Sequence, residues 1–245
     1  MTITSPHNEK LKEIRKLNAR RRERERAGRF VAEGEDLLAA ADEAGWAPVF
    51  RLCADGSGLE GEEVVPELLA AASELGSGTR AMAVYEEQWA PAAVGPLCVY
   101  LHGVSDPGNV GTVLRSAHAF GASCVALGPG SADPFGPKAV RASMGSIFHV
   151  PVTRAPELPG TTIALVAGEG APIDELCPSI SPIDTWRDKE RAITVLVGAE
   201  RDGLPDDVVA GADHVAQIPT AIHSLNAAMA ATVALYELTR RMPPA

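Results

Sequence analysis

The feature that most constrains the fold is a series of short apolar runs in residues 97–240 that alternates with longer segments of helical character. The runs are only four to six residues long, which favours strands over helices. Because they are apolar almost throughout, they fit parallel strands covered on both faces of a sheet. The expected strands are Leu97–His102, Cys124–Leu127, Thr162–Val166, Ile193–Val197 and His214–Ile218. The expected helices are Asn109–Phe120, Lys138–Gly145 and Leu225–Arg241.

Residues 8–86 show a similar alternation on a smaller scale. A helix is expected over residues 8–27, where apolar residues recur at three-residue spacing among charges. The other expected elements are the strands Arg29–Ala32, Val49–Cys53 and Ala81–Tyr85 and the helices Glu35–Ala44 and Pro66–Leu75. The predicted organisation is α/β throughout, with a small domain over residues 1–88, a Pro- and Ala-rich linker over 89–96 and a larger domain over 97–245.

Charge is distributed unevenly along the chain. The net charge is −10, yet residues 10–29 hold ten Lys/Arg against three Asp/Glu. The remaining residues hold 12 basic and 29 acidic side chains. This asymmetry indicates an anion-binding arm on an acidic body, and the alternative is a solvated helix with skewed charge. Aromatic residues are only 4% of the chain, which argues against platforms that stack single-stranded bases.

Other features disfavour several classes of protein. The four cysteines form no CxxC pair, so neither a metal site nor a disulfide framework is expected; they are Cys53, Cys98, Cys124 and Cys177. No secretory signal or membrane-length apolar run is found, which favours a cytoplasmic location. There is no GxSxG elbow for hydrolase chemistry. The GPG at residues 128–130 lacks the third glycine of a dinucleotide-binding fingerprint, which disfavours a nucleotide-dependent oxidoreductase.

Three polar patches in the larger domain are candidate sites, and the first is at residues 105–117. A Pro107-Gly108 turn delivers Asn109 to the start of a helix, and Arg115 follows six residues later. Asn offers both a donor and an acceptor, while Arg presents a planar fork suited to phosphate. The alternative is an N-cap Asn and a surface Arg on an ordinary helix.

The second and third patches each follow an expected strand, where sites in α/β folds gather. In one, Gly198 ends the strand and is expected to let a ligand approach the backbone, and Glu200 follows in a loop. The alternative is a plain strand-to-loop turn with exposed charges. In the other, Ile218 ends the strand, and Ser224 and Asn226 bracket the start of the last helix. Ser224 is the natural N-cap, whereas Asn226 is a poor helix former just inside the helix.

Taken in order, these patches resemble the motifs of the SpoU (TrmH) family, the RNA ribose 2′-O-methyltransferases of the SPOUT class. The matching motifs are N-x5-R at Asn109–Arg115, G-x-E at Gly198–Glu200 and I-P…S-L-N at Ile218–Asn226, with an intermotif stretch at Gly136–Phe148. Residues 8–86 resemble the small ribosomal-protein-like domain that many members use to bind RNA. Two departures are a short loop between Pro219 and Ser224 and Ala199 where the family frequently has Asn or Gln.

The resemblance implies a trefoil-knotted methyltransferase domain that uses S-adenosylmethionine and no metal. It implies cofactor contacts from Gly198, Ile218 and Leu225. The implied catalytic residues are Arg115, which would stabilise the developing alkoxide, and the orienting residues Asn109, Glu200, Ser224 and Asn226. The implied RNA-binding residues are Arg20, Arg21, Arg22, Arg24 and Arg26. It also implies a homodimer joined by the helix at residues 226–241.

The substrate implied by the resemblance is structured RNA, with ribosomal RNA favoured over transfer RNA because of the appended N-terminal domain. Two alternatives stay open: a transfer-RNA 2′-O-methyltransferase, and a non-catalytic RNA-binding protein of the same fold.

Overall fold

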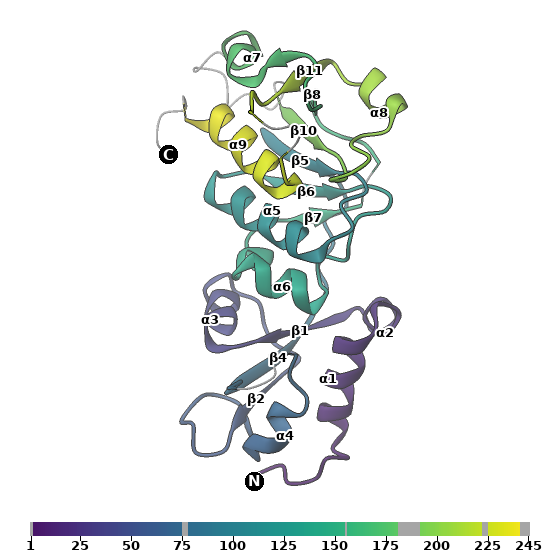
Figure 1. Ribbon diagram of the computed structural model, residues 1–245. Coiled ribbons are helices and arrows are strands. Elements are labelled where there is room, and N and C mark those ends of the chain that lie inside the picture. Colours follow the sequence, from purple (N-terminus) through teal and green to yellow (C-terminus); the bar gives the residue numbers. More distant parts are fainter. Residues whose placement is uncertain (1, 75–77, 155, 181–191, 222–224, 241–245) are drawn as a thin grey trace.

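The computed structural model describes residues 2–74, 78–154, 156–180, 192–221 and 225–240, which form two β-sheets with helices packed around them (Figure 1). The four-stranded sheet has the strand order β1-β4-β2-β3, and the seven-stranded sheet has the order β7-β6-β5-β10-β8-β11-β9. The strands of the small sheet are β1 Arg29–Glu33, β2 Phe50–Ala54, β3 Glu62–Val64 and β4 Ala81–Glu86. The strands of the large sheet are β5 Leu97–Leu101, β6 Cys124–Leu127, β7 Val152–Thr153, β8 Thr161–Leu165, β9 Ala171–Pro172, β10 Ile193–Val197 and β11 His214–Gln217.

Every pairing in the large sheet is parallel, as the apolar runs predict. Alternate side chains face opposite sides, so Val99, Val125 and Val195 lie in one apolar cluster and Cys98 and Cys124 in another. The helices α5 (Pro107–Ala119) and α9 (Ala227–Thr239) cover the first face. The other face is covered more thinly, by loops and by the short helix α8 (Asp206–Ala210). The α/β fold class is confirmed, with helices concentrated on one face.

The small sheet is mixed, because β4 pairs antiparallel with β1 and β2 while β2 pairs parallel with β3. Helix α1 (Glu9–Ala19) lays Leu11, Ile14 and Leu17 on one face of this sheet. Helices α3 (Glu35–Glu43) and α4 (Pro66–Ala70) complete this part, and α4 is shorter than expected. Strand β3 was not expected, since two of its three residues are Glu. The N-terminal residue Ile3 pairs beside it.

The expectation of a single helix over residues 8–27 was wrong, because the structure has two helices there. The chain leaves the helical conformation at Arg20, whose φ and ψ are −142° and 123°, and restarts as α2 (Arg21–Ala27). The break redirects the chain so that Arg24 points back, and its guanidinium donates to the carbonyl of Leu17 at 2.6 Å. The apolar spacing ends at Leu17 and residues 20–26 are all charged, so the sequence contains no signal that places the break at Arg20.

One apolar cluster runs without interruption from the small sheet into the large one. Aromatic rings fill the junction, which we call the joint. The ring of Phe30 lies 4.8 Å from that of Phe135 and 5.9 Å from that of Phe148, measured between centroids. Trp46 packs edge-on against Phe148 and donates its indole N–H to the Phe148 carbonyl at 2.9 Å. Helix α6 (Pro137–Ser143) also lies between the two sheets (Figure 1).

The connection between the sheets, residues 87–96, packs along the large sheet. Trp89 forms an isolated bridge with Val152, and the amide of Ala90 donates to the Val152 carbonyl at 2.8 Å. The Trp89 ring lies 5.1 Å from that of Phe135. The segment expected to be a linker therefore contributes to the joint. None of the described helices is long and apolar enough to cross a membrane.

Candidate functional site

Three side chains from distant parts of the chain form one hydrogen-bonded group at the carboxyl edge of the large sheet. The side-chain amides of Asn109 and Asn226 each donate from Nδ2 to Oε1 of Glu200, both at 2.5 Å. The Asn226 amide also donates to Oδ1 of Asn109 at 3.1 Å. We call these three residues the polar triad. The prediction that the three patches converge is confirmed for these members.

Asn109 is free to join the triad because another residue caps its helix. Helix α5 begins at Pro107, and Oδ1 of Asp106 accepts from the amides of Gly108 and Asn109 at 2.6 and 3.2 Å. A hydrogen bond from Lys138, at 2.8 Å, holds the pKa of the Asp106 carboxyl below its usual range. Asn109 is therefore not the N-cap, and its side chain projects from the first turn toward Glu200.

Asn226 has two roles, since it both caps α9 and joins the triad. Its Oδ1 accepts from the amides of Ala228 and Met229 at 2.9 and 3.3 Å, which satisfies the free N–H groups of the first turn. The helix accordingly begins at Ala227 and not at Leu225. Its N-cap is Asn226 and not Ser224, which corrects the expectation from the sequence. Ser224 itself lies outside the described residues, so its catalytic role remains a prediction.

The loop after β10 presents Glu200 at the tip of a tight turn. Ala199 and Gly203 exchange backbone hydrogen bonds of 3.1 and 3.0 Å. A Cβ at Gly198 would lie only 2.1 Å from the carbonyl carbon of Gly203 and 2.3 Å from the amide of Leu204. The sequence suggested that this glycine admits a ligand. In the structure, it admits the chain's own returning loop.

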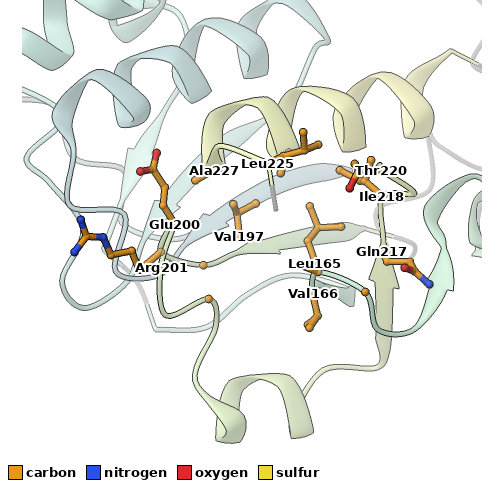
Figure 2. Close-up of a pocket in the computed structure, with 16 residues that line it drawn as sticks. Leu165, Val166, Val197, Glu200, Arg201, Gln217, Ile218, Thr220, Leu225 and Ala227 are labelled. Carbon is orange, nitrogen blue, oxygen red and sulfur yellow. The ribbon is translucent and has the colours of Figure 1, made fainter. Parts of the chain in front are cut away.

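A cavity of about 550 Å³ opens beside the triad, between the ends of β8, β10 and β11 and the start of α9. Figure 2 shows Leu165 and Val197 rising from their strands toward Leu225, with Glu200 at one end of the cavity. The three predicted cofactor residues, Gly198, Ile218 and Leu225, all line it. A cavity of this size, with apolar walls and a few polar groups, is typical of a small-molecule site.

One wall of this cavity was not predicted from the sequence. Residues 165–168, at the carboxyl end of β8, line it together with Gln217 and Thr220. The strand itself was expected, and the Gly168-Glu169-Gly170 that follows is the signal of a close backbone turn that would have identified the loop. No patch was assigned there because the wall is mostly apolar and main chain.

Arg115 stands apart from the triad. It is exposed on α5, and within the described ranges it has no hydrogen-bond or ion-pair partner. Six residues of helix separate it from Asn109 by about 9 Å along the axis and place it on a different side of the helix. The predicted association of Arg115 with Asn109, Glu200 and Asn226 is therefore not made within this chain as described.

Four of the five predicted RNA-binding arginines, Arg20, Arg21, Arg22 and Arg26, are exposed, and the fifth is a correction. Arg24 is 6% exposed and pairs with Asp133 of the large domain, with 2.8 Å between its Nη2 and Oδ2. Its guanidinium is therefore buried at the joint, where it cannot contact RNA. In the parts of the chain that the structure describes, no group of three or more His, Cys, Asp or Glu could hold a metal.

Both halves of the chain are similar to known protein families. The sequence model of the SpoU rRNA Methylase family matches residues 96–236, and that of the MRM3-like substrate binding domain matches residues 8–90. The 23S rRNA (guanosine(2553)-2′-O)-methyltransferase RlmP of Bacillus subtilis is 29% identical, covering 96% of this chain and 98% of that protein. The 23S rRNA (uridine(2479)-2′-O)-methyltransferase of Streptomyces viridochromogenes is 31% identical, covering 98% and 92%.

Solved structures agree with these sequence relatives. The AdoMet-bound rRNA methyltransferase from Sinorhizobium meliloti has a TM-score of 0.83 and 27% identity, covering 100% of this chain and 99% of that one. The SpoU methyltransferase AviRb from Streptomyces viridochromogenes, in complex with AdoMet, has a TM-score of 0.79 and 27% identity, covering 96% and 98%. Both matches extend over both sheets of the structure.

Proposed function

This chain belongs to the SpoU rRNA methylase family, and on that premise we propose that it transfers a methyl group from S-adenosylmethionine to a ribose 2′-hydroxyl of ribosomal RNA. The observation that carries the proposal is the polar triad at the mouth of the 550 Å³ cavity. Both curated relatives named above are 2′-O-methyltransferases of 23S rRNA, but their target nucleosides differ. The proposal therefore names ribosomal RNA and leaves the base open.

The cavity fits S-adenosylmethionine chemically. Leu165, Val197 and Ile218 offer apolar surface to a purine ring, and the main-chain groups at the strand ends offer partners for its polar edge. The Glu200 carboxylate at the cavity mouth favours a cationic sulfonium nearby. When bound, this cofactor supplies an electrophilic methyl group. Gly198 and Leu225 would hold it by main-chain and apolar contact.

The polar triad would orient the ribose. Two of the triad's hydrogen bonds end at Oε1 of Glu200 and the third ends at Oδ1 of Asn109. The three side chains are therefore held in position before substrate binds. A positioned acceptor and donor can align a hydroxyl for in-line attack, which is the main requirement of a displacement with a good leaving group. Asn109, Glu200, Asn226 and Ser224 would share this positioning role.

Arg115 would act on the nucleotide from the exposed side of α5. Arginine stays protonated to above about pH 12, so it is a poor base but a strong stabiliser of negative charge. We assign it to stabilising the alkoxide that develops on the 2′-oxygen, with a further contact to the adjacent phosphate. Because Arg115 and Asn109 are fixed on one helix, the contact with Arg115 would depend on how the nucleotide lies on α5 and not on a movement of Arg115 toward the triad.

The assembly belongs to the same proposal. We propose a homodimer formed through α9, where the exposed Met229 and Tyr236 offer apolar surface at 62% and 49% exposure. A trefoil knot near the cavity and a cytoplasmic location are further parts of the proposal. Domain boundaries at residues 88 and 97 are also proposed, and they are supported by the end of β4 at Glu86 and the start of β5 at Leu97.

The deciding experiment maps ribose methylation in ribosomal RNA from cells with and without this gene, and then assays the purified protein on RNA from the deficient cells. Loss of one 2′-O-methyl group in vivo and its restoration in vitro are expected. Arg115→Ala should lower the rate about 100- to 1,000-fold while S-adenosylmethionine binding is retained. Arg80→Ala is the control, because Arg80 is exposed and distant in the small domain. A protein that binds RNA but not S-adenosylmethionine would identify the non-catalytic alternative.

A further inference from the structure

A second cavity of about 560 Å³ lies between the two domains, away from the cavity beside the triad. Its floor and walls come from the loop after β6 and from Tyr100 of β5. Two arginines line it, one from each domain: Arg21 of α2 and Arg154, which follows β7. Arg21 is one of the predicted RNA-binding arginines, but no role has been assigned to the cavity itself.

The loop that forms its floor is held in place by the large sheet. The Ser131 hydroxyl donates to the Leu101 carbonyl at 2.8 Å, and the amide of Ala132 donates to the Val104 carbonyl at 2.9 Å. The amide of Gly103 donates to the Pro129 carbonyl at 2.9 Å. The cavity is therefore preformed, as ligand sites usually are.

Its cationic rim is organised by one acidic residue. The Glu25 carboxylate accepts a hydrogen bond from Arg21 at 2.8 Å. It also forms a longer ion pair with Arg154, with 3.8 Å between the nitrogen and the oxygen. The Arg154 guanidinium also lies over the Trp89 ring, 4.0 Å from its centroid. Both arginines stay about half exposed. The Glu25 carboxylate thus holds two guanidinium groups at the rim, and both keep exposed surface for an anion.

The cavity lies along the same carboxyl edge of the sheet as the polar triad. Along that edge, the loop after β6 contacts the loop after β5 at Gly103, and a Cβ at Gly103 would lie 3.4 Å from that of Ala199, the neighbour of Glu200. Strands in a sheet are about 4.8 Å apart, so the loops of β6 and β10 are separated by about 10 Å. A chain of nucleotides that places one ribose at Glu200 has its neighbours within reach of this cavity.

We propose that the interdomain cavity binds one unpaired nucleotide of the RNA substrate close to the nucleotide that is methylated. Its phosphate contacts Arg21 and Arg154, and its base lies on the apolar floor formed by Leu127, Pro129 and Pro156. Duplex RNA cannot enter a cavity of this size, whereas the splayed bases of loops and bulges can. The inference rests on the proposed function, and it assigns the substrate to a single-stranded or bulged segment.

The test measures methyl transfer to ribosomal RNA from cells that lack the gene, with S-adenosylmethionine saturating. Arg21→Ala and Arg154→Ala should each raise KM for RNA about 10-fold with little change in kcat. Each should also lower the salt dependence of RNA binding by about one charge. Arg21→Ala avoids the Trp89 contact, so it separates RNA binding from stability. Arg80→Ala is the control and should leave KM unchanged.

Glu25→Gln gives a result of opposite sign. It releases both guanidinium groups from their carboxylate, so KM for RNA should fall about 3-fold. A merely structural role for the three residues predicts a loss or no change. The inference is overturned if the wild-type protein transfers methyl groups while all three variants keep its KM. If the wild-type protein transfers none, the proposed function itself fails and this inference fails with it.

Discussion

The buried Arg24–Asp133 pair and the polar triad both join distant parts of the chain, and their surroundings differ completely. Arg24 and Asp133 meet in the joint with side chains that are 7% and 8% exposed. The Asn109–Glu200–Asn226 triad lies at an open sheet edge, where Glu200 is exposed. The first contact closes a space between domains, and the second leaves its acceptor accessible beside a cavity.

The comparison teaches that the burial of a polar contact separates a stabilising role from a functional one. A buried ion pair contributes little net stability when intact. Removing one partner destabilises the fold strongly, because the other charge stays buried without compensation. An exposed polar group contributes less to folding and remains available to substrate. Mutations in the two regions should therefore affect different measurements.

The largest effect is expected at the joint. Arg24→Ala leaves Asp133 buried without its partner, and we expect the free energy of unfolding to fall by about 4 kcal/mol and Tm by about 10 °C. Arg26→Ala, which removes an exposed pair with Glu23, should change it by less than about 1 kcal/mol. Thermal and denaturant unfolding measure both. Similar small losses would show that the buried pair is dispensable.

At the sheet edge, activity should fall while stability is kept. Asn226→Ser retains an N-cap but loses both triad hydrogen bonds, so we expect the methyl-transfer rate to fall about 100-fold with Tm nearly unchanged. Asn226→Ala should also lose about 1 kcal/mol of stability because the cap is gone. Single-turnover rates and melting curves separate the two roles. Full activity in the Ser variant would remove Asn226 from the positioning group.

The neighbours of Arg24 offer a sharper contrast within one segment. Arg20 and Arg22 are exposed and have no ion-pair partner among the described residues. Replacing both with Ala should weaken RNA binding about 10-fold and lower its salt dependence by about two charges, with Tm unchanged. Arg80→Ala serves as the control in the same domain. Unchanged salt dependence would mean that this surface does not contact the RNA backbone.

The smallest effect concerns a carboxyl at the joint. Burial raises the pKa of Glu87 above its usual value, although its carboxylate accepts from the Trp89 indole at 2.8 Å. The unfolded chain therefore loses this proton first, and the group's contribution to stability falls as pH rises above about 4.5. Glu87→Gln should flatten this fall by less than about 1 kcal/mol, since the group is half solvated. Glu86→Gln is the exposed control in the pH-dependent unfolding series.

The strands were the most predictable part of the fold. The expected Cys124–Leu127 and Ile193–Val197 coincide with β6 and β10, because a buried parallel strand must be apolar on both faces and ends where polarity begins. Helix starts were less predictable. Ser224 and Asn226 are both good N-caps, and the sequence does not reveal which is used. Asn226 is favoured once its amide has partners in Asn109 and Glu200, which come from other loops.

The site was predictable as a set of loops but not as a geometry. The resemblance grouped Asn109, Glu200 and Asn226, and the structure brings these three together. It also grouped Arg115 with them and Arg24 with the RNA-binding arginines, and the structure places both of these elsewhere. Seven consecutive charged residues at 20–26 include all five predicted RNA-binding arginines, and the local sequence does not distinguish one arginine from another. Arg24 differs from the others because it pairs with Asp133, which lies 109 positions away in the sequence. Similarly, the reason for Gly198 lies in a loop that returns five residues later.

The aromatic joint has a consequence for how such enzymes can be recombined. Rings from the small sheet, from the connecting segment and from the large sheet interlock, so none of the three pieces has a complete apolar surface on its own. Exchanging the N-terminal module for that of a relative would create voids or clashes unless the opposing rings travel with it. Changing the RNA target by exchanging the N-terminal module therefore requires a matched set of aromatic residues on both sides of the joint.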